Sequence, residues 1–164
     1  MDHTADLARA ALVGIGATLV MDSWLALLRR AGIETLDFAL IGRWVGHLAR
    51  GRVAHAAIRK AAPVAGERAL GWLAHYATGI AFAGALVAIE GTAWMRAPSL
   101  LPALAVGVGS VAAPFLVMQP AMGAGLAASK TPAPWRNRAR SVANHAVFGL
   151  GLYVSAAVLA GVAS

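Results

Sequence analysis

The sequence lacks cysteine and has few charged residues. None of its 164 residues is cysteine, and 13% are Asp, Glu, Lys or Arg, whereas 59% are hydrophobic. Soluble domains are usually about 25% charged and about 45–50% apolar. The absence of cysteine excludes disulfides, zinc–thiolate sites and thiol nucleophiles. The apolar excess argues against a soluble enzyme and against a disordered chain, and it indicates a membrane protein.

Charges are missing from four long stretches. Between Arg9 and Arg29 the only charged residue is Asp22, and the stretches 69–89, 97–129 and 141–164 contain none. A helix needs about 20 apolar residues to cross a bilayer, and the two-residue alternation of a membrane barrel is not present. The sequence therefore predicts an all-α fold, an integral membrane four-helix transmembrane bundle. We expect a single membrane domain over 1–164, with spans near 8–28, 69–90, 100–128 and 141–162.

Basic residues gather in two of the connections. Twelve of the fourteen Lys and Arg residues lie within 29–68 and 129–140, and four spans put these connections on the same side. The positive-inside rule makes that side the cytoplasm and leaves both termini on the other side. Contacts with anionic lipids account for the net charge of +7 without a nucleic-acid partner.

The connection 29–68 is the only sizeable segment outside the spans. Leu36, Leu40, Trp44 and Leu48 follow at four-residue steps, which predicts a cytoplasmic amphipathic helix at the membrane interface. A second short helix is expected over 53–61. His47 and His55 are eight residues apart and need not meet, so the sequence does not indicate a metal site in this connection.

Proline and glycine mark places where helices bend or approach closely. Pro114 and Pro120 each remove a backbone N–H from the third span, so 118–125 is predicted to be kinked or partly unwound. A plain proline kink is the commoner of these outcomes in membrane helices. Small residues four apart, such as Gly14 and Thr18 or Gly151 and Ser155, favour close helix packing.

Polar side chains recur at one depth of the predicted bundle. At 1.5 Å per residue they lie roughly 7–17 Å from the cytoplasmic ends of their helices. Ionisable groups inside a membrane are costly, so they mark a candidate site by default. The candidate ligand or proton site consists of Asp22, His75, His145, Gln119 and Met122.

Three chemistries fit these residues. Asp22, His75 and His145 together match the donors of a divalent metal ion. His75 and His145 could instead be the axial pair of a b-type haem, and an Asp–His pair could carry protons. Met118 and Met122 would add soft sulfur ligands for Cu(I). The structural alternative is a hydrogen-bonded network that only fixes helix packing.

No catalytic motif is present. The chain has no Ser-His-Asp order, nucleotide-binding loop or HExxH sequence, so no catalytic residue is predicted and an enzyme is not indicated. We expect a membrane protein whose cytoplasmic leaflet holds the Asp–His site. A structural or assembly subunit of a larger membrane complex and a small oligomeric transporter are the alternatives. The bilayer is the expected partner in each case.

Several motifs resemble those of a known family. They are 66–72 (GERALGW) with His75–Tyr76, 118–120 (MQP), 129–132 (SKTP), and His145 with 148–153 (FGLGLY). They resemble a bacterial family of small membrane proteins catalogued as a domain of unknown function, over about 11–160. The resemblance implies a four-helix protein of the bacterial inner (plasma) membrane, and it implies no activity. With that location, the bias of basic residues makes both termini periplasmic.

Overall fold

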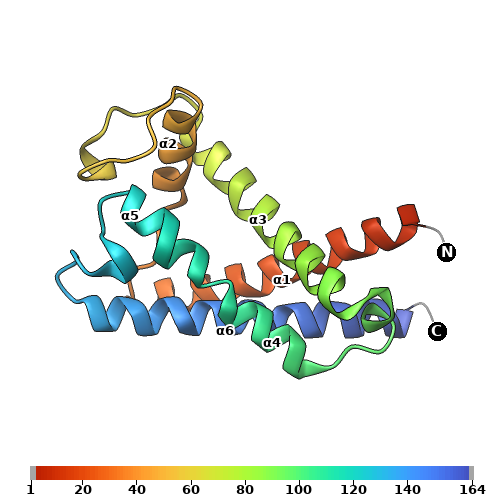
Figure 1. Cartoon of the computed structure of the whole chain (residues 1–164). Coiled ribbons are helices and arrows are strands. Elements are labelled where there is room, and N and C mark those ends of the chain that lie inside the picture. Colours follow the sequence, from red (N-terminus) through yellow and green to blue (C-terminus); the bar gives the residue numbers. More distant parts are fainter. Residues whose placement is uncertain (1–2, 163–164) are drawn as a thin grey trace. The chain divides into compact units, whose positions relative to one another are not determined.

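The computed structural model describes residues 3–162, which are mostly helical and contain no β-strand. Figure 1 shows the long helices α1 (His3–Arg30), α3 (Glu67–Glu90) and α6 (Pro134–Val162) and the shorter α2 (Phe38–Leu48) and α4 (Leu100–Gly109). Four helical stretches are long and apolar enough to cross a membrane: His3–Arg30, Glu67–Glu90, Leu100–Ala121 and Pro134–Val162. The predicted all-α fold with four candidate spans is confirmed.

The chain forms two compact units, which we describe separately. The first unit comprises 3–34, 76–110 and 143–162, and the second unit comprises 35–75 and 111–142. The boundaries fall inside α3 and α6 and directly after Ser110 in the third span. The basic connections of the sequence therefore belong mainly to the second unit.

Close backbone contacts hold the helices of the first unit together. A Cβ on Gly14 would lie 2.6 Å from Ile80 Cα, and one on Gly151 would lie 2.8 Å from the Ala17 carbonyl oxygen. Small residues permit such approaches, as the sequence predicted. Around these contacts lie fully buried apolar side chains, among them Val13, Ala17, Leu86 and Leu152.

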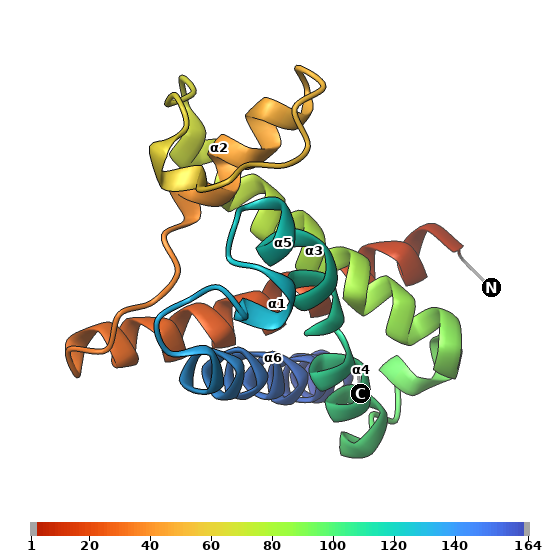
Figure 2. The same cartoon turned by 60° about the vertical axis from the view of Figure 1, so that its left-hand side comes forward.

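The second unit begins with the predicted amphipathic helix. Asp37 precedes α2 and accepts a hydrogen bond from the Ala39 N–H at 3.0 Å, which caps the helix. Leu36 therefore lies outside α2. The short helix expected over 53–61 is reduced to a single 3₁₀ turn, η1 (Ile58–Lys60), within the long loop that follows α2 in Figure 2.

The third span is broken, and its helix ends earlier than predicted. After α4 the chain forms a π-helical turn at Pro114–Met118 (η3) and the short α5 (Gln119–Ala121), so the predicted end at 128 is wrong. The two prolines cannot donate to the preceding turn, and Gly123 has a φ of +93°. The segment after α5 is unwound, which goes beyond a plain proline kink.

Alanine at Gly123 is expected to destabilise the second unit by more than about 2 kcal/mol. An alanine at this position would keep a left-handed φ, which side chains disfavour. Its Cβ would overlap the Ala56 carbonyl oxygen and would lie 2.8 Å from the His55 carbonyl oxygen. Denaturant unfolding in detergent measures the loss. Gly84→Ala is the control, because its Cβ would have no neighbour within 4 Å. If the two variants were equally stable, the close backbone contact at Gly123 would not be needed for the stability of the second unit.

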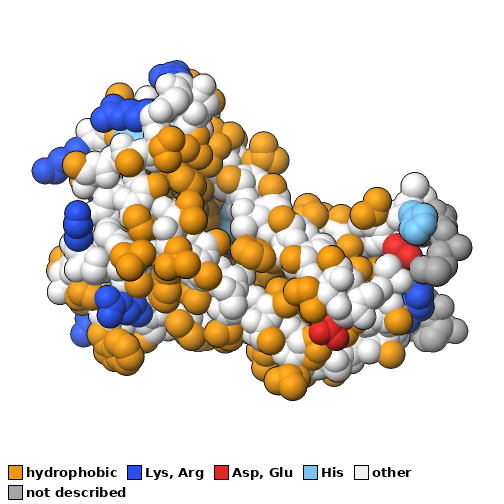
Figure 3. Space-filling view, viewed as in Figure 1, with side chains coloured by type: hydrophobic (Ala, Val, Ile, Leu, Met, Phe, Trp, Pro, Cys, Tyr) orange, Lys and Arg blue, Asp and Glu red, His pale blue; other side chains and the backbone are white. Residues whose placement is uncertain are grey.

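Apolar side chains cover much of the molecular surface. Figure 3 shows hydrophobic side chains over the visible face, and exposed ones include Leu73, Ile89, Leu101 and Leu116. Between 17% and 28% of each candidate span's most apolar window is buried within the protein. Lipid would solvate the remaining apolar surface, so the structure is consistent with a membrane location.

Candidate functional site

Asp22, a carboxylate in the C-terminal third of α1, is hydrogen-bonded to a tyrosine of α3. The Tyr76 hydroxyl donates to Asp22 Oδ2 at 2.8 Å, and both side chains belong to the first unit and are half-buried. A carboxylate among apolar helices is costly unless it accepts hydrogen bonds. Tyr76 thus supplies one of the contacts that make this position tolerable.

The crossing of α1 and α3 brings these two groups together. Gly14, Thr18 and Asp22 lie four residues apart on one face of α1. Gly14 approaches the backbone of Ile80, and the Thr18 hydroxyl, which donates to the Gly14 carbonyl at 2.8 Å, occupies the space beside Gly79. Tyr76 lies one turn before Gly79, so the same small-residue contact carries its hydroxyl to Asp22.

His145 is bonded to a different partner. Its Nδ1 lies 2.7 Å from Ser110 Oγ, and Ser110 also donates to the Gly107 carbonyl at 2.6 Å. Because a hydroxyl has one proton, Ser110 accepts from the Nδ1–H of the imidazole. Gly107 allows this arrangement, since a Cβ there would overlap the backbone of Gly149.

A bond between α1 and α6 was not predicted. Trp24 Nε1 donates to Asn144 Oδ1 at 2.9 Å. Two residues earlier, Asp22 faces α3, so α1 contacts α3 with one face and α6 with another. The signal for this pair was weak, because neither Trp24 nor Asn144 is ionisable and each would pass for an interfacial or packing residue.

The other predicted site residues lie in the second unit. The His75 ring packs against Phe38 with centroids 4.4 Å apart and against Trp72 at 5.9 Å. Met122 is buried with Leu40 and Ile58. Gln119 Oε1 is buried and has no hydrogen-bond partner.

The predicted site residues therefore divide between the units. Asp22 and His145 lie in the first unit with separate partners, and His75, Gln119 and Met122 lie in the second. Within residues 3–162 no group of three or more His, Cys, Asp or Glu side chains is placed to hold a metal ion. Asp22 and His145 are each hydrogen-bonded to a hydroxyl within the first unit.

His47 and His55, which their spacing did not predict to be in contact, lie within hydrogen-bond distance. His47, in the last turn of α2, and His55, in the loop after it, are 5% and 6% exposed, and His47 Nδ1 lies 2.7 Å from His55 Nε2. The chain reverses between them through Gly51, whose φ is +75°, and Arg52 N–H donates to the His47 carbonyl. Spacing alone could not reveal this pair because a turn, not a helix, joins its members.

The titration of His55 gives a test of this pair. Burial, with help from the positive charge of Arg52, lowers the pKa of His55 below its usual 6.5. Between the lower native pKa and 6.5 the unfolded chain therefore binds more protons than the native chain. The stability that the neutral His55 ring contributes is full above pH 6.5 and is lost as the pH falls through 6.5 to the native pKa. We expect thermal stability in detergent to fall between pH 7.5 and pH 5, about one proton being taken up on unfolding. His55→Gln should flatten this pH dependence, whereas the exposed His3→Gln should leave it unchanged.

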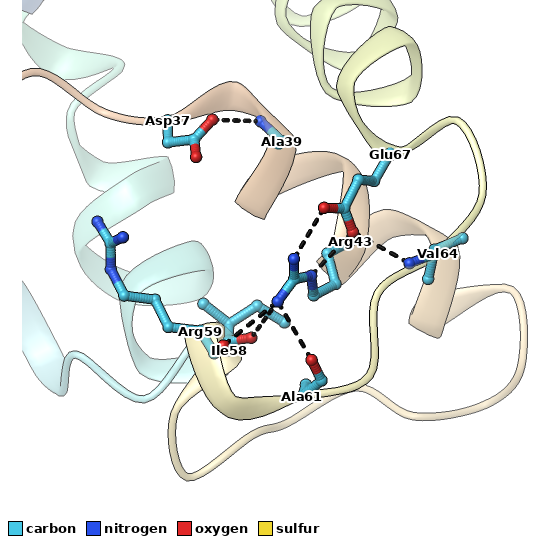
Figure 4. Close-up of polar contacts among 8 residues, drawn as sticks. All are labelled: Asp37, Ala39, Arg43, Ile58, Arg59, Ala61, Val64 and Glu67. Carbon is cyan, nitrogen blue, oxygen red and sulfur yellow. Dashed lines mark hydrogen bonds and ion pairs between the residues drawn. The ribbon is translucent and has the colours of Figure 1, made fainter.

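An ion pair closes the loop after α2 (Figure 4). Arg43 Nε and one terminal nitrogen each lie 2.8 Å from an oxygen of Glu67, and its other terminal nitrogen donates to the carbonyls of Ile58, Arg59 and Ala61. Glu67 also accepts from the Val64 N–H at 3.0 Å. The hydrogen bond to Glu67 raises the pKa of Arg43, so the guanidinium stays charged. The loop and the start of α3 are thus fastened to α2.

Comparison with known proteins gives one family. The family model described as "Protein of unknown function (DUF2938)" matches residues 11–159. The comparisons with curated proteins and with solved structures gave no match.

Proposed function

Because the chain belongs to the DUF2938 family, whose description assigns no activity, we propose its function from its intramembrane polar groups. We propose that this chain is a multi-pass membrane protein and that its Asp22 side chain takes up and releases a proton within the first unit. The observation that carries this proposal is the Tyr76–Asp22 hydrogen bond of 2.8 Å between two candidate spans. An ionisable side chain at such a position is a functional candidate by default.

The donor set favours a proton over a metal ion. Asp22 is paired with a phenol, and His145 donates to a hydroxyl. Both partners can exchange protons through hydrogen bonds, and an imidazole titrates near neutral pH. A visible spectrum of the purified protein tests the haem alternative for His75 and His145. A Soret band would show bound haem and would favour that alternative over the proton site.

Infrared difference spectra between pH 5 and pH 9 test the proposal in lipid. We expect a pH-dependent carboxylic-acid C=O band that Asp22→Asn removes and whose frequency Tyr76→Phe changes, because the Tyr76 hydroxyl donates to Asp22 Oδ2. Asp37→Asn is the control, since Asp37 caps α2 and lies outside the candidate spans. A band that survives Asp22→Asn contradicts the proposal.

The proposal includes a location in the bacterial inner membrane, with periplasmic termini and cytoplasmic basic connections. The bias of basic residues supports it. Since the chain has no cysteine, single exposed serines can be replaced. An impermeant maleimide applied to spheroplasts is expected to label Ser99→Cys and not Ser129→Cys. The opposite pattern would invert the topology.

An assembly role is the second candidate. Small residues at Ala77, Ala81, Gly84 and Ala88 are exposed along α3, and a Cβ on Gly84 would meet nothing within 4 Å. Such a stripe favours packing against another membrane helix, from a second copy or a larger complex. If this is the function, Gly84→Leu should reduce cross-linked oligomers, while Ala105→Leu on α4 should not.

A further inference from the structure

The His47–His55 pair lies in the second unit, outside the four candidate spans. Both rings are more than nine-tenths buried, and their facing nitrogens are 2.7 Å apart. Most buried side-chain polar atoms in proteins have at least one hydrogen-bond partner. One atom of this pair has none.

One nitrogen of the pair has no partner. His55 Nδ1 is buried and makes no hydrogen bond. If His47 donates to His55 Nε2, the proton of His55 lies on Nδ1 and has no acceptor. If His55 Nε2 donates, Nδ1 is a buried lone pair without a donor. In both tautomers the pair is incomplete as a purely structural bond, which carries a penalty.

A methionine is held in the same part of the second unit. The His55 N–H donates to the Ala121 carbonyl at 2.8 Å, and the Ile58 N–H donates to the Met122 carbonyl at 3.0 Å. The Met122 side chain is 8% exposed and packs with Leu40 and Ile58. Leu40 lies two turns before His47 on α2, so both belong to one helix face. These backbone bonds hold Met122 beside the segment that carries His55.

We propose that the His47–His55 pair binds a soft metal ion of low coordination number, Cu(I), with Met122 as a thioether ligand. The ion takes the place of the shared proton. The donor ring moves its N–H proton to its other nitrogen, so both neutral rings present a lone pair and no net proton is released. Two metal–nitrogen bonds of about 2.0–2.1 Å would separate the facing nitrogens by roughly 1 Å more than now.

The chemistry of the donors selects this ion. Thioethers favour Cu(I), and imidazoles suit copper. Zinc usually takes four ligands, and the described residues offer no third His, Cys, Asp or Glu beside the pair. The positive charge of Arg52, which acts on His55, disfavours a divalent ion more than a monovalent one.

Copper binding to the full chain in detergent tests the proposal. Cu(I) is titrated anaerobically against a chromophoric chelator, with Zn(II) as a parallel probe. We expect one Cu(I) per chain, bound at least about a hundredfold more weakly by His47→Gln and by His55→Gln. His3→Gln, an exposed histidine, is the matched control and should bind as the wild type does.

X-ray absorption on the wild type keeps the test independent of variant folding. We expect two nitrogen scatterers and one sulfur scatterer, the sulfur being lost in Met122→Leu and kept in Met95→Leu. Three results would overturn the proposal: no copper retained by the wild type, equal binding by the wild type and the His47→Gln/His55→Gln double variant, or retention of Zn(II) alone. The proton proposal for Asp22 concerns the first unit, so either proposal can fail without the other.

Discussion

Gly42→Ala is expected to detach α2 from α3 and to cost more than about 3 kcal/mol of the stability of the second unit. A Cβ on Gly42 would overlap the carbonyl oxygen of Glu67 and lie 2.6 Å from the Gly71 nitrogen, and a Cβ on Gly71 would overlap the Phe38 carbonyl. These neighbours are backbone atoms of two helices. They cannot turn aside as a flexible side chain can, so the helices must separate.

Denaturant unfolding and proteolysis of the loop after α2 measure this effect. Gly46→Ala is the matched control on the same helix, because its Cβ would lie 2.8 Å from a methyl group of Val64, a side chain that can move. We expect Gly46→Ala to cost much less than Gly42→Ala. If both variants unfold at the same denaturant concentration, the backbone contact between α2 and α3 is not what holds them together.

Arg43→Gln is expected to open the loop and to raise trypsin cleavage at Arg59 and Lys60 at least about tenfold. The substitution leaves Glu67 without its cation and removes the donor shared by the carbonyls of Ile58, Arg59 and Ala61. Arg43→Lys should rescue little of this loss, because an ammonium group cannot reproduce the planar, two-pronged bond to a carboxylate.

The matched control is Arg50→Gln, an exposed arginine in the same connection. It removes one positive charge and one tryptic site without touching the Glu67 contact, and it should leave cleavage at Arg59 and Lys60 unchanged. Equal cleavage rates in Arg43→Gln and Arg50→Gln would show that the ion pair is only a surface contact.

Local patterns in the sequence predicted the helices well and their ends less well. Four stretches with no charge, or with Asp22 alone, located the four candidate spans. The four-residue steps at Leu40, Trp44 and Leu48 located α2. The third span ended early because Pro120 lacks a backbone N–H for the helix and Gly123 readily adopts a positive φ. A pattern of uncharged residues does not take these two backbone effects into account. Membership of an uncharacterised family was also visible in the motifs.

The partners of the polar groups could not be predicted in the same way. Helical periodicity put Asp22, His75 and His145 at one depth, yet the choice of Tyr76 for Asp22 depends on where Gly14 meets the backbone of Ile80. The contact between His47 and His55 depends on the turn through Gly51. Such contacts join residues distant in the chain or separated by irregular backbone, where no period exists to count.

The sequence by itself determined that this chain is helical and apolar, where its candidate spans lie, and which side chains are too polar for them. These properties follow from the cost of placing charges and open backbone bonds in lipid, which each segment meets on its own. The tertiary structure alone decided which polar groups share hydrogen bonds and which buried histidine nitrogen has none. Those outcomes depend on a helix crossing at Gly14 and a turn at Gly51, which bring together residues that no local pattern connects.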